Sequence, residues 1–387
     1  MDPIKVLSIV CVLKKKSNMK LSYWEHKEWF SNVDFTIVGS GIVGLNCALA
    51  LKKEHPIANI LVLEKGMLPQ GASSKNAGFA CFGSLSELID DLKTHSEEAV
   101  FNLVKKRWEG LKLLRSNLGD AAIGFQQNKG FELFQDAAFY EECNSKRPNI
   151  NQLIAPIFKQ DVFLESTNTY GFENIQPNYI VNQFEGQIDT GKMVTQLLLK
   201  VQKAGVKILN NITLETFTEK EGSVVVKTNL LEFSTNKLFI ATNGFAKQLL
   251  DENVQPARAQ VIITKPIENL HIKGTFHLDK GYYYFRNIDD RILFGGGRNL
   301  DFKGEETSEF GQTEIIQNSL KTILKETILP NTDFEIEHSW SGIMGVGNQK
   351  NAIVKSISNN VFCGVRLGGM GVAIGSLVGK ELAELLK

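Results

Sequence analysis

Three glycines and one glutamate have the types and spacing that bind a dinucleotide. Gly39, Gly41 and Gly44 form a GxGxxG motif, and Glu64 follows twenty residues after the last of them. In such a motif the first glycine permits a sharp turn, the second lets a pyrophosphate approach the backbone, and the third lets a helix pack closely on a strand. The carboxylate accepts hydrogen bonds from ribose hydroxyls. The four residues therefore predict a dinucleotide site.

The elements needed to position these residues follow in the expected order. An apolar run at 35–38 precedes the glycines, residues 45–53 are helical in character, and a second apolar run at 60–63 leads to Glu64. This is the order strand, turn, helix, strand of a βαβ unit, whose helix start offers free N–H groups and a positive dipole end to phosphates. The alternative is a tight turn that binds nothing.

A second run of small and hydroxyl residues indicates which dinucleotide binds. Glu64-Lys65-Gly66 leads into the sequence GASSKNAGF at 71–79. This pattern resembles the D-amino-acid oxidase-like flavoproteins, the group that holds glycine oxidase, sarcosine oxidase and γ-glutamylputrescine oxidase. The resemblance implies FAD, with Glu64 on the adenosine ribose and residues 73–78 along the pyrophosphate and flavin.

Further segments extend the resemblance over about residues 20–387. They lie at 241–244, at 340–342 and in the glycine-rich run 364–375, which leads into a C-terminal helix. The resemblance implies that this helix start lies against the electron-rich end of the flavin. The expected cofactor-binding residues are Gly39, Ser40, Gly41, Ile42, Val43, Gly44, Glu64, Lys65, Ala72, Ser73, Ser74, Asn76, Ala77, Gly78, Leu214, Ala241, Thr242, Gly244, Gly342, Gly369, Met370, Gly371 and Val372.

The substrate side is expected on a strand near residue 284. Alternate side chains of a strand share a face, so Tyr282, Tyr284 and Arg286 line up together and suit a small anion or amine. The resemblance implies a tyrosine at Tyr284 and an arginine at 344, where this chain has Met344. The departure favours an amine, or an acid held by another cation. The expected substrate residues are Tyr284, Arg286, Met344 and Arg366, with Arg298 as a further candidate cation.

Composition limits the other classes of function. The 43 basic and 43 acidic residues balance, which disfavours a nucleic-acid surface or a polybasic membrane patch. Five dispersed cysteines without CxxC spacing, and histidines without HxH or HxxxH pairing, predict a reducing compartment, a cytoplasmic location and no metal site. Residues 1–19 are expected to be an extension or tail with translation beginning at Met19, and a secretory signal is the alternative.

The expected fold is α/β: a Rossmann-type FAD-binding lobe interleaved with an antiparallel-sheet substrate lobe. The predicted FAD-binding domain comprises 20–83, 186–255 and 340–387, and the substrate domain comprises 84–185 and 256–339. Residues 84–118 are expected to be largely helical, 125–134 to form a strand pair around 128–130, and 147–148 to form a turn.

These features predict an FAD-dependent oxidoreductase that oxidises the C–N bond of a small amine or amino acid. Hydride would pass to flavin N5, and the imine would hydrolyse. The expected partners are the small-molecule substrate and oxygen or another electron acceptor, with no nucleic acid and no stable membrane insertion. Leu293 stands where sarcosine oxidase carries an oxygen-activating lysine, so oxidase and dehydrogenase both stay open. Alternatives are a nicotinamide-dependent dehydrogenase, a non-catalytic flavin-binding protein and a tRNA-modifying flavoprotein demethylase.

Overall fold

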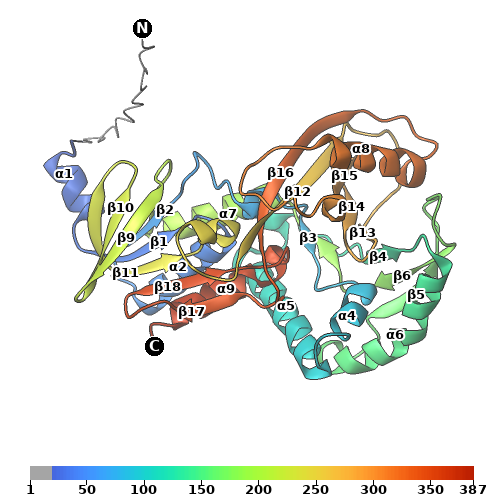
Figure 1. Cartoon of the computed structure of the whole chain (residues 1–387), viewed down its shortest axis with the longest axis horizontal. Coiled ribbons are helices and arrows are strands. Elements are labelled where there is room, and N and C mark those ends of the chain that lie inside the picture. Colours follow the sequence, from blue (N-terminus) through green and yellow to red (C-terminus); the bar gives the residue numbers. More distant parts are fainter. Residues whose placement is uncertain (1–19) are drawn as a thin grey trace, which may run out of the picture.

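The protein is built around two eight-stranded sheets joined through several crossings of the chain (Figure 1). The computed structural model describes residues 20–387, so the expectations for residues 1–19 lie outside the described part. Within that part, no helix is both long and apolar enough to cross a membrane. The predicted cytoplasmic location stays a prediction.

The first sheet carries the glycine motif. Its central strand β1 (Val33–Val38) runs parallel to β2 (Ile60–Leu63) on one side and to β11 (Glu232–Ile240) on the other. The outer strands are β8 (Lys207–Leu209), β18 (Val361–Val365), β17 (Ile353–Ser356), β9 (Leu214–Lys220) and β10 (Ser223–Thr228). Every β2 residue is buried, as expected for a parallel strand covered on both faces.

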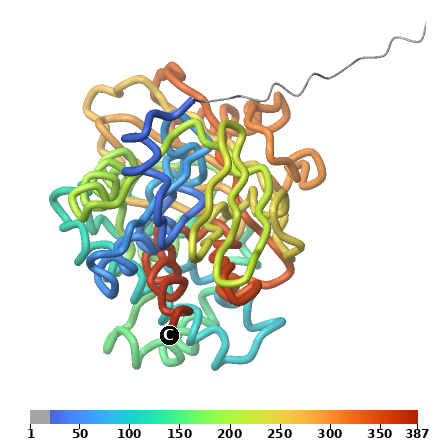
Figure 2. The backbone as a smooth tube through the Cα atoms, turned by 90° about the vertical axis from the view of Figure 1, so that its left-hand side faces the viewer, coloured from blue at the N-terminus to red at the C-terminus, as the bar shows by residue number. Residues whose placement is uncertain are grey.

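Helices from both ends of the chain cover this sheet. Helix α2 (Ile42–Glu54) follows the glycine turn and packs against α9 (Gly371–Glu384), the last helix. A side chain at Gly379 of α9 would overlap the carbonyl oxygen of Val43, so glycine permits this close approach. Figure 2 shows the blue segment that follows β1 beside the red C-terminal helix. Helices α5 (Glu97–Leu118) and α7 (Thr190–Lys203) also contact each other beside this core.

The second sheet is mainly antiparallel. Its strands, in spatial order, are β16 (Ile336–Val346), β12 (Gln255–Thr264), β15 (Arg291–Gly296), β14 (Tyr283–Ile288), β13 (Thr275–Leu278), β4 (Gly130–Leu133), β6 (Asn178–Asn182) and β5 (Phe163–Thr167). Stacked rings of Phe276 and Phe285, 4.5 Å apart, lie in its core. Helix α8 (Glu314–Ile323) packs on β12 and β15.

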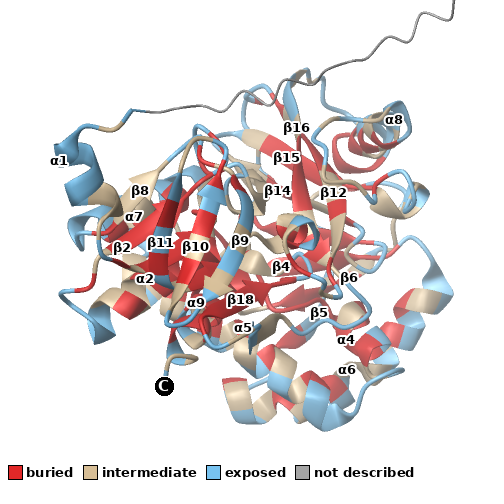
Figure 3. Cartoon of the chain, turned by 60° about the vertical axis from the view of Figure 1, so that its left-hand side comes forward, coloured by how far each residue is buried: buried red, intermediate tan, exposed pale blue. Residues whose placement is uncertain are grey.

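Short elements connect the two sheets or flank them. Two-residue strands β3 (Phe79–Ala80) and β7 (Gly186–Gln187) pair where the chain passes between the sheets. The remaining helices and helical turns are α1 (Tyr23–Glu25), η1 (His26–Phe30), α3 (Ala72–Lys75), α4 (Leu85–Asp91), η2 (Ala121–Ile123), α6 (Ala137–Phe158), η3 (Asn243–Gln248), η4 (Arg298–Leu300) and η5 (Leu324–Ile328). Figure 3 shows buried central strands and exposed outer faces on α1 and α6.

Two local expectations are wrong. Helix α6 continues through Arg147 and Pro148, where a turn was expected, because its inner face is held by tertiary contacts. Asn151 of this helix bonds the backbone of Val162 and Phe163 through its side-chain amide. Within residues 125–134 the structure has one strand, β4 (Gly130–Leu133), and no hairpin, since Gln126 bridges to Gln187 instead.

The division into two interleaved lobes stays a prediction. The first sheet takes its strands from the three segments predicted for FAD binding, and most strands of the second come from the two predicted for substrate binding. The exception is β16, which continues to Val346 in the second sheet although residues from 340 onward were assigned to the FAD-binding lobe. Its register with the whole of β12 explains this placement.

Candidate functional site

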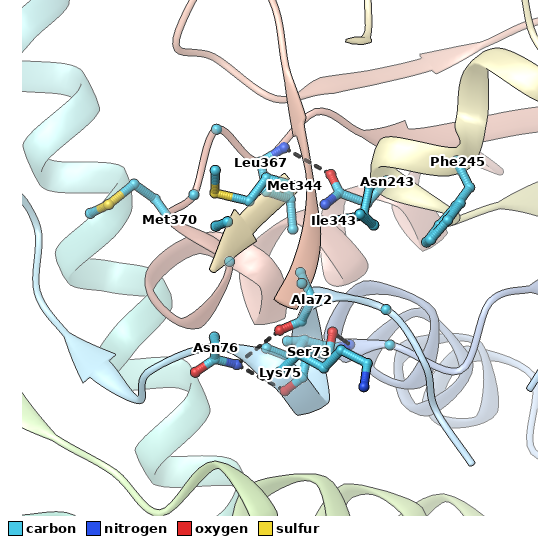
Figure 4. A pocket seen from close by; sticks show the side chains of 18 of the residues that line it. Ala72, Ser73, Lys75, Asn76, Asn243, Phe245, Ile343, Met344, Leu367 and Met370 are labelled. Carbon is cyan, nitrogen blue, oxygen red and sulfur yellow. Dashed lines mark hydrogen bonds between the residues drawn. The ribbon is translucent and has the colours of Figure 1, made fainter. Parts of the chain in front are cut away.

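A cavity of ≈ 1120 Å³ extends from the glycine motif to the second sheet. Its wall includes the β1–α2 turn, the α3 segment, strands β12, β14 and β16, and the start of α9. Figure 4 shows Ser73 and Asn76 facing this space from below, with Met344 and Met370 opposite them. Segments far apart in the chain thus enclose one elongated space.

Glu64 anchors the end of the cavity next to the glycine motif. One of its carboxylate oxygens accepts hydrogen bonds from the Ser40 backbone N–H at 3.1 Å and from the Ser40 hydroxyl at 2.6 Å. The other accepts from the Gly66 N–H at 2.9 Å. Glu64 is buried and also lines the cavity. The carboxylate is therefore held in one orientation, with acceptor capacity left for ribose hydroxyls.

The glycine turn leaves no room for side chains. Gly39 has φ +104°, and a Cβ there would come within 2.7 Å of the Ala241 carbonyl oxygen. At Gly41 a Cβ would lie 2.8 Å from the Ser73 hydroxyl oxygen. At Gly44 it would overlap the Gly39 carbonyl. These glycines shape a backbone surface on the cavity wall, which is the cradle that a pyrophosphate needs.

The α3 segment is tied to that turn and forms the cavity floor. The Ser73 hydroxyl oxygen accepts a hydrogen bond from the Ile42 N–H at 2.9 Å (Figure 4). The Asn76 amide oxygen accepts from the Gly78 N–H at 2.8 Å and from the Thr190 hydroxyl at 3.0 Å. The cavity's polar floor is thus preformed by its own hydrogen bonds.

The far end is closed by the η3 turn, β16 and the start of α9. The Asn243 side-chain oxygen accepts from the Leu367 N–H at 3.1 Å (Figure 4), and the Trp340 indole donates to the Lys75 carbonyl at 3.0 Å. Gly369 has φ +81°, and a Cβ there would lie 3.4 Å from the Met344 sulfur. The α3 segment and this glycine turn therefore line the same cavity.

Most of the expected cofactor-binding residues line this one cavity. Those on its wall are Gly39, Gly41, Ile42, Val43, Glu64, Lys65, Ala72, Ser73, Asn76, Ala77, Gly78, Leu214, Ala241, Thr242, Gly342, Gly369, Met370, Gly371 and Val372. Four others lie behind the wall. Ser40 bonds Glu64, Ser74 bonds Pro69 and Gly71 carbonyls, and Gly44 and Gly244 allow close backbone packing.

Tyr284 and Met344 lie on the wall, as expected for substrate residues. The Tyr284 ring covers Gly295, where a Cβ would approach it to 2.7 Å. Burial raises the pKa of Tyr284 to about 12, so the phenol stays neutral. Leu293 packs with Ala77 and Val261 in an apolar cluster beside this ring. The wall is therefore apolar on the side of Tyr284 that faces this cluster.

Two expected substrate residues point elsewhere. Arg286 is buried and donates to the carbonyls of Ala77 and Ile188, below the α3 segment. Burial lowers the pKa of its guanidinium to about 10. Arg366 donates to the carbonyls of Asn351 and Asn253. Neither side chain lines the cavity, because backbone carbonyls take their donors.

Other wall residues were not identified from the sequence as site residues. His277 of β13 lies opposite Tyr284 in the strand register and bonds Glu185 at 2.6 Å. Although burial alone would lower it, the Glu185 carboxylate raises the pKa of His277 to about 9. Glu87 also lines the wall and accepts a hydrogen bond from the Ser84 N–H at 2.9 Å. The SxxE capping pattern at 84–87 was visible, but its place at the site depends on the fold.

Comparisons with known proteins agree with a dinucleotide-binding cavity. The family described as FAD dependent oxidoreductase (DAO) matches residues 34–385. The chain is 21% identical to the probable oxidoreductase OrdL of Haemophilus influenzae over 92% of this chain and 83% of that protein. It is 22% identical to the probable oxidoreductase OrdL of Rhizobium meliloti over 91% of this chain and 82% of that protein.

Solved structures have the same fold. L-proline dehydrogenase from P. horikoshii has a TM-score of 0.74 and 19% identity, with 92% of this chain and 93% of that one covered. Glycine oxidase from Geobacillus kaustophilus has a TM-score of 0.73 and 18% identity, with 91% and 94% covered. At these identities the likeness shows the fold alone.

Proposed function

The chain belongs to the FAD dependent oxidoreductase family, and from this premise we propose that it oxidises the C–N bond of a small amine or amino acid. Membership in this family confirms the predicted enzyme class, the predicted cofactor and the D-amino-acid oxidase-like resemblance. The names of similar proteins support the choice of substrate, because they include a glycine oxidase and an iminodiacetate oxidase.

One observation carries the proposal: the dinucleotide end and the Tyr284 wall belong to a single cavity. Glu64, the glycine turn and the α3 segment would hold the adenosine and pyrophosphate, and the α9 start would face the ring. When bound, FAD supplies the hydride acceptor for the oxidation. The end of the cavity near Tyr284, Met344 and Gly369 would then hold the flavin ring and is the ring end of the cavity. A molecule next to Tyr284 would lie at this ring end.

The side chains of the wall and of the cluster behind it would position the substrate and exclude water. Tyr284 and Met344 would position the substrate, and the cluster of Leu293, Val261 and Ala77 would keep water from the reacting carbon. No protein base is required once the amine is neutral, because its lone pair assists the loss of hydride. Hydrolysis of the resulting imine completes the reaction.

The proposal is tested by an anaerobic visible spectrum of the purified holoenzyme, titrated with amines and small amino acids. We expect the flavin absorption to bleach with at least one compound, and readmitted air then separates an oxidase from a dehydrogenase. A panel of amines and amino acids that leaves the spectrum unchanged, while dithionite bleaches it, would contradict the proposal.

A further inference from the structure

The cations in and beside the cavity differ in the protein groups that they contact. Arg286 and Arg366 are bound to carbonyl oxygens. Lys350 pairs with Asp91, and His277 pairs with Glu185. Lys280 lies over the Phe139 ring, 5.4 Å from its centroid, and Lys75 lies over the Phe310 ring at 5.1 Å. The two arginines, Lys350 and His277 thus donate to oxygen atoms of the protein, whereas these two lysines have aromatic partners.

Arg298 differs from Arg286 and Arg366. It lines the cavity, and among residues 20–387 its side chain has no hydrogen-bond or ion-pair partner. Its guanidinium lies over the Phe302 ring, 4.7 Å from the centroid, which leaves the N–H donors at its edge free. Burial lowers the pKa of Arg298, while the charges of Tyr282, Glu305 and Glu306 act in the opposite direction.

The backbone fixes where this arginine enters the cavity. Gly297, with φ +78°, turns the chain out of β15, and its N–H donates to the Tyr282 carbonyl at 3.0 Å. Arg298 therefore follows a turn that is hydrogen-bonded to Tyr282, the residue immediately before the strand β14 that carries Tyr284. Tyr282 also lines the cavity, and its ring packs on Phe302.

The position of Arg298 is well separated from the apolar ring end. Met344 of β16 pairs with Ala257 of β12, and Gly296 of β15 pairs with Gln260 of the same strand. Two strand spacings across the sheet, about 10 Å, and three residues along β12, about 10 Å, thus separate Met344 from Gly296, the last residue of the strand that leads to Arg298. Met344 itself lies against the Gly369 turn and the Gly244 backbone.

From this arrangement we propose that Arg298 binds the carboxylate of an ω-amino acid, whose amine reaches the ring end. Guanidinium binds carboxylate through two parallel hydrogen bonds, and the apolar wall by Tyr284 suits the methylene chain. The carboxylate is held away from Met344, so the substrate is longer than an α-amino acid. This inference rests on the proposed function for the amine oxidation, but the binding of the carboxylate can be tested alone.

The first experiment measures binding without turnover. Acetate, butyrate and hexanoate are titrated into the oxidised holoenzyme, and dissociation constants are taken from the shift of the flavin spectrum and from calorimetry. We expect Arg298→Gln to weaken butyrate or hexanoate binding roughly tenfold or more, and Arg298→Lys to weaken it less. Arg291→Gln removes a half-exposed arginine of β15, paired with Glu337 at 2.7 Å, and should leave carboxylate binding unchanged.

The second experiment compares substrates of increasing length. Glycine, β-alanine, 4-aminobutyrate and 6-aminohexanoate are each set against the alkylamine of equal length in anaerobic flavin reduction. We expect a longer amino acid to reduce the flavin faster than both glycine and the alkylamine of equal length. Arg298→Gln should remove this difference by raising the KM of the amino acid. Met344→Arg should shift the preference toward glycine.

The outcomes separate the two proposals. Alkylamines that reduce the flavin as well as the amino acids do, in both wild type and Arg298→Gln, would overturn the carboxylate site. The proposed amine oxidation would be unaffected by that result. Acids that bind through Arg298 while no amine reduces the flavin would overturn the proposed function alone. Unchanged carboxylate affinity in Arg298→Gln, with normal FAD content, would overturn the inference directly.

Discussion

At the scale of single residues, the nucleotide end of the cavity is shaped by groups that already hold hydrogen bonds before anything binds. Glu64 accepts from Ser40 and Gly66, so its carboxylate shapes the turn and also faces the cavity. The same residue is thus structural and functional. Substitutions there should affect both stability and cofactor affinity.

The Glu64→Gln variant should show this double effect. The amide replaces one acceptor oxygen by a donor that faces an N–H, which costs roughly 1–3 kcal/mol of stability and weakens FAD binding. Urea unfolding with and without FAD measures both quantities. Glu54→Gln, at an exposed helix end, is the control and should have little effect. An unchanged FAD dissociation constant in Glu64→Gln would contradict the assigned role.

The His277–Glu185 pair predicts a pH dependence of stability. The folded-state pKa of His277 is about 9, above its ordinary value of 6.5. Protonated His277 stabilises the fold fully at pH values below its pKa in the unfolded chain. This contribution to stability is therefore lost as pH rises from about 6.5 to 9. Glu185, Glu87 and Glu132 face the ring and cause the rise. Denaturant midpoints measured across this range should fall in wild type and be flatter in His277→Gln. Parallel profiles would disprove the assignment.

At the scale of elements, the packing of β1 against α2 depends on Gly44. A Cβ there would overlap the Gly39 carbonyl, and backbone cannot yield as a flexible side chain does. Gly44→Ala should therefore destabilise the protein by about 1–3 kcal/mol and lower its FAD content. The control is Gly71→Ala, since that Cβ would meet nothing within 4 Å. Equal melting temperatures of the two variants would show that the turn adjusts.

Sequence patterns predicted the elements that are local and missed those that depend on distant partners. The βαβ unit, α7, β10 and α9 follow from apolar periodicity and glycine position. Helix α6 does not, because Asn151 and buried contacts outweigh the effect of Pro148. Tyr284 was predicted on the wall, but Arg286 on the same strand turns to the Ala77 carbonyl, a partner that no spacing reveals. His277 and Glu87 reach the wall only through the pairing of strands and helices.

At the scale of the whole molecule, the cavity takes its wall from both sheets, so a bound cofactor bridges them. A ligand that binds only the folded state adds stability by mass action, about 2.7 kcal/mol at one hundred times its dissociation constant. FAD added to stripped protein should therefore raise a single melting transition. Two separate transitions, with only one shifted, would show that the cofactor contacts one lobe alone.

The arrangement of strands in the first sheet has a consequence for synthesis on the ribosome. Strand β1 is made early, but its neighbour β11 ends at Ile240 and the next strand, β18, begins at Val361. The nascent chain therefore carries an apolar strand with an open edge until far more of the protein has emerged. Pairing across such long separations is slow and exposes the chain to aggregation. The protein should depend on chaperones during translation more than its final stability suggests.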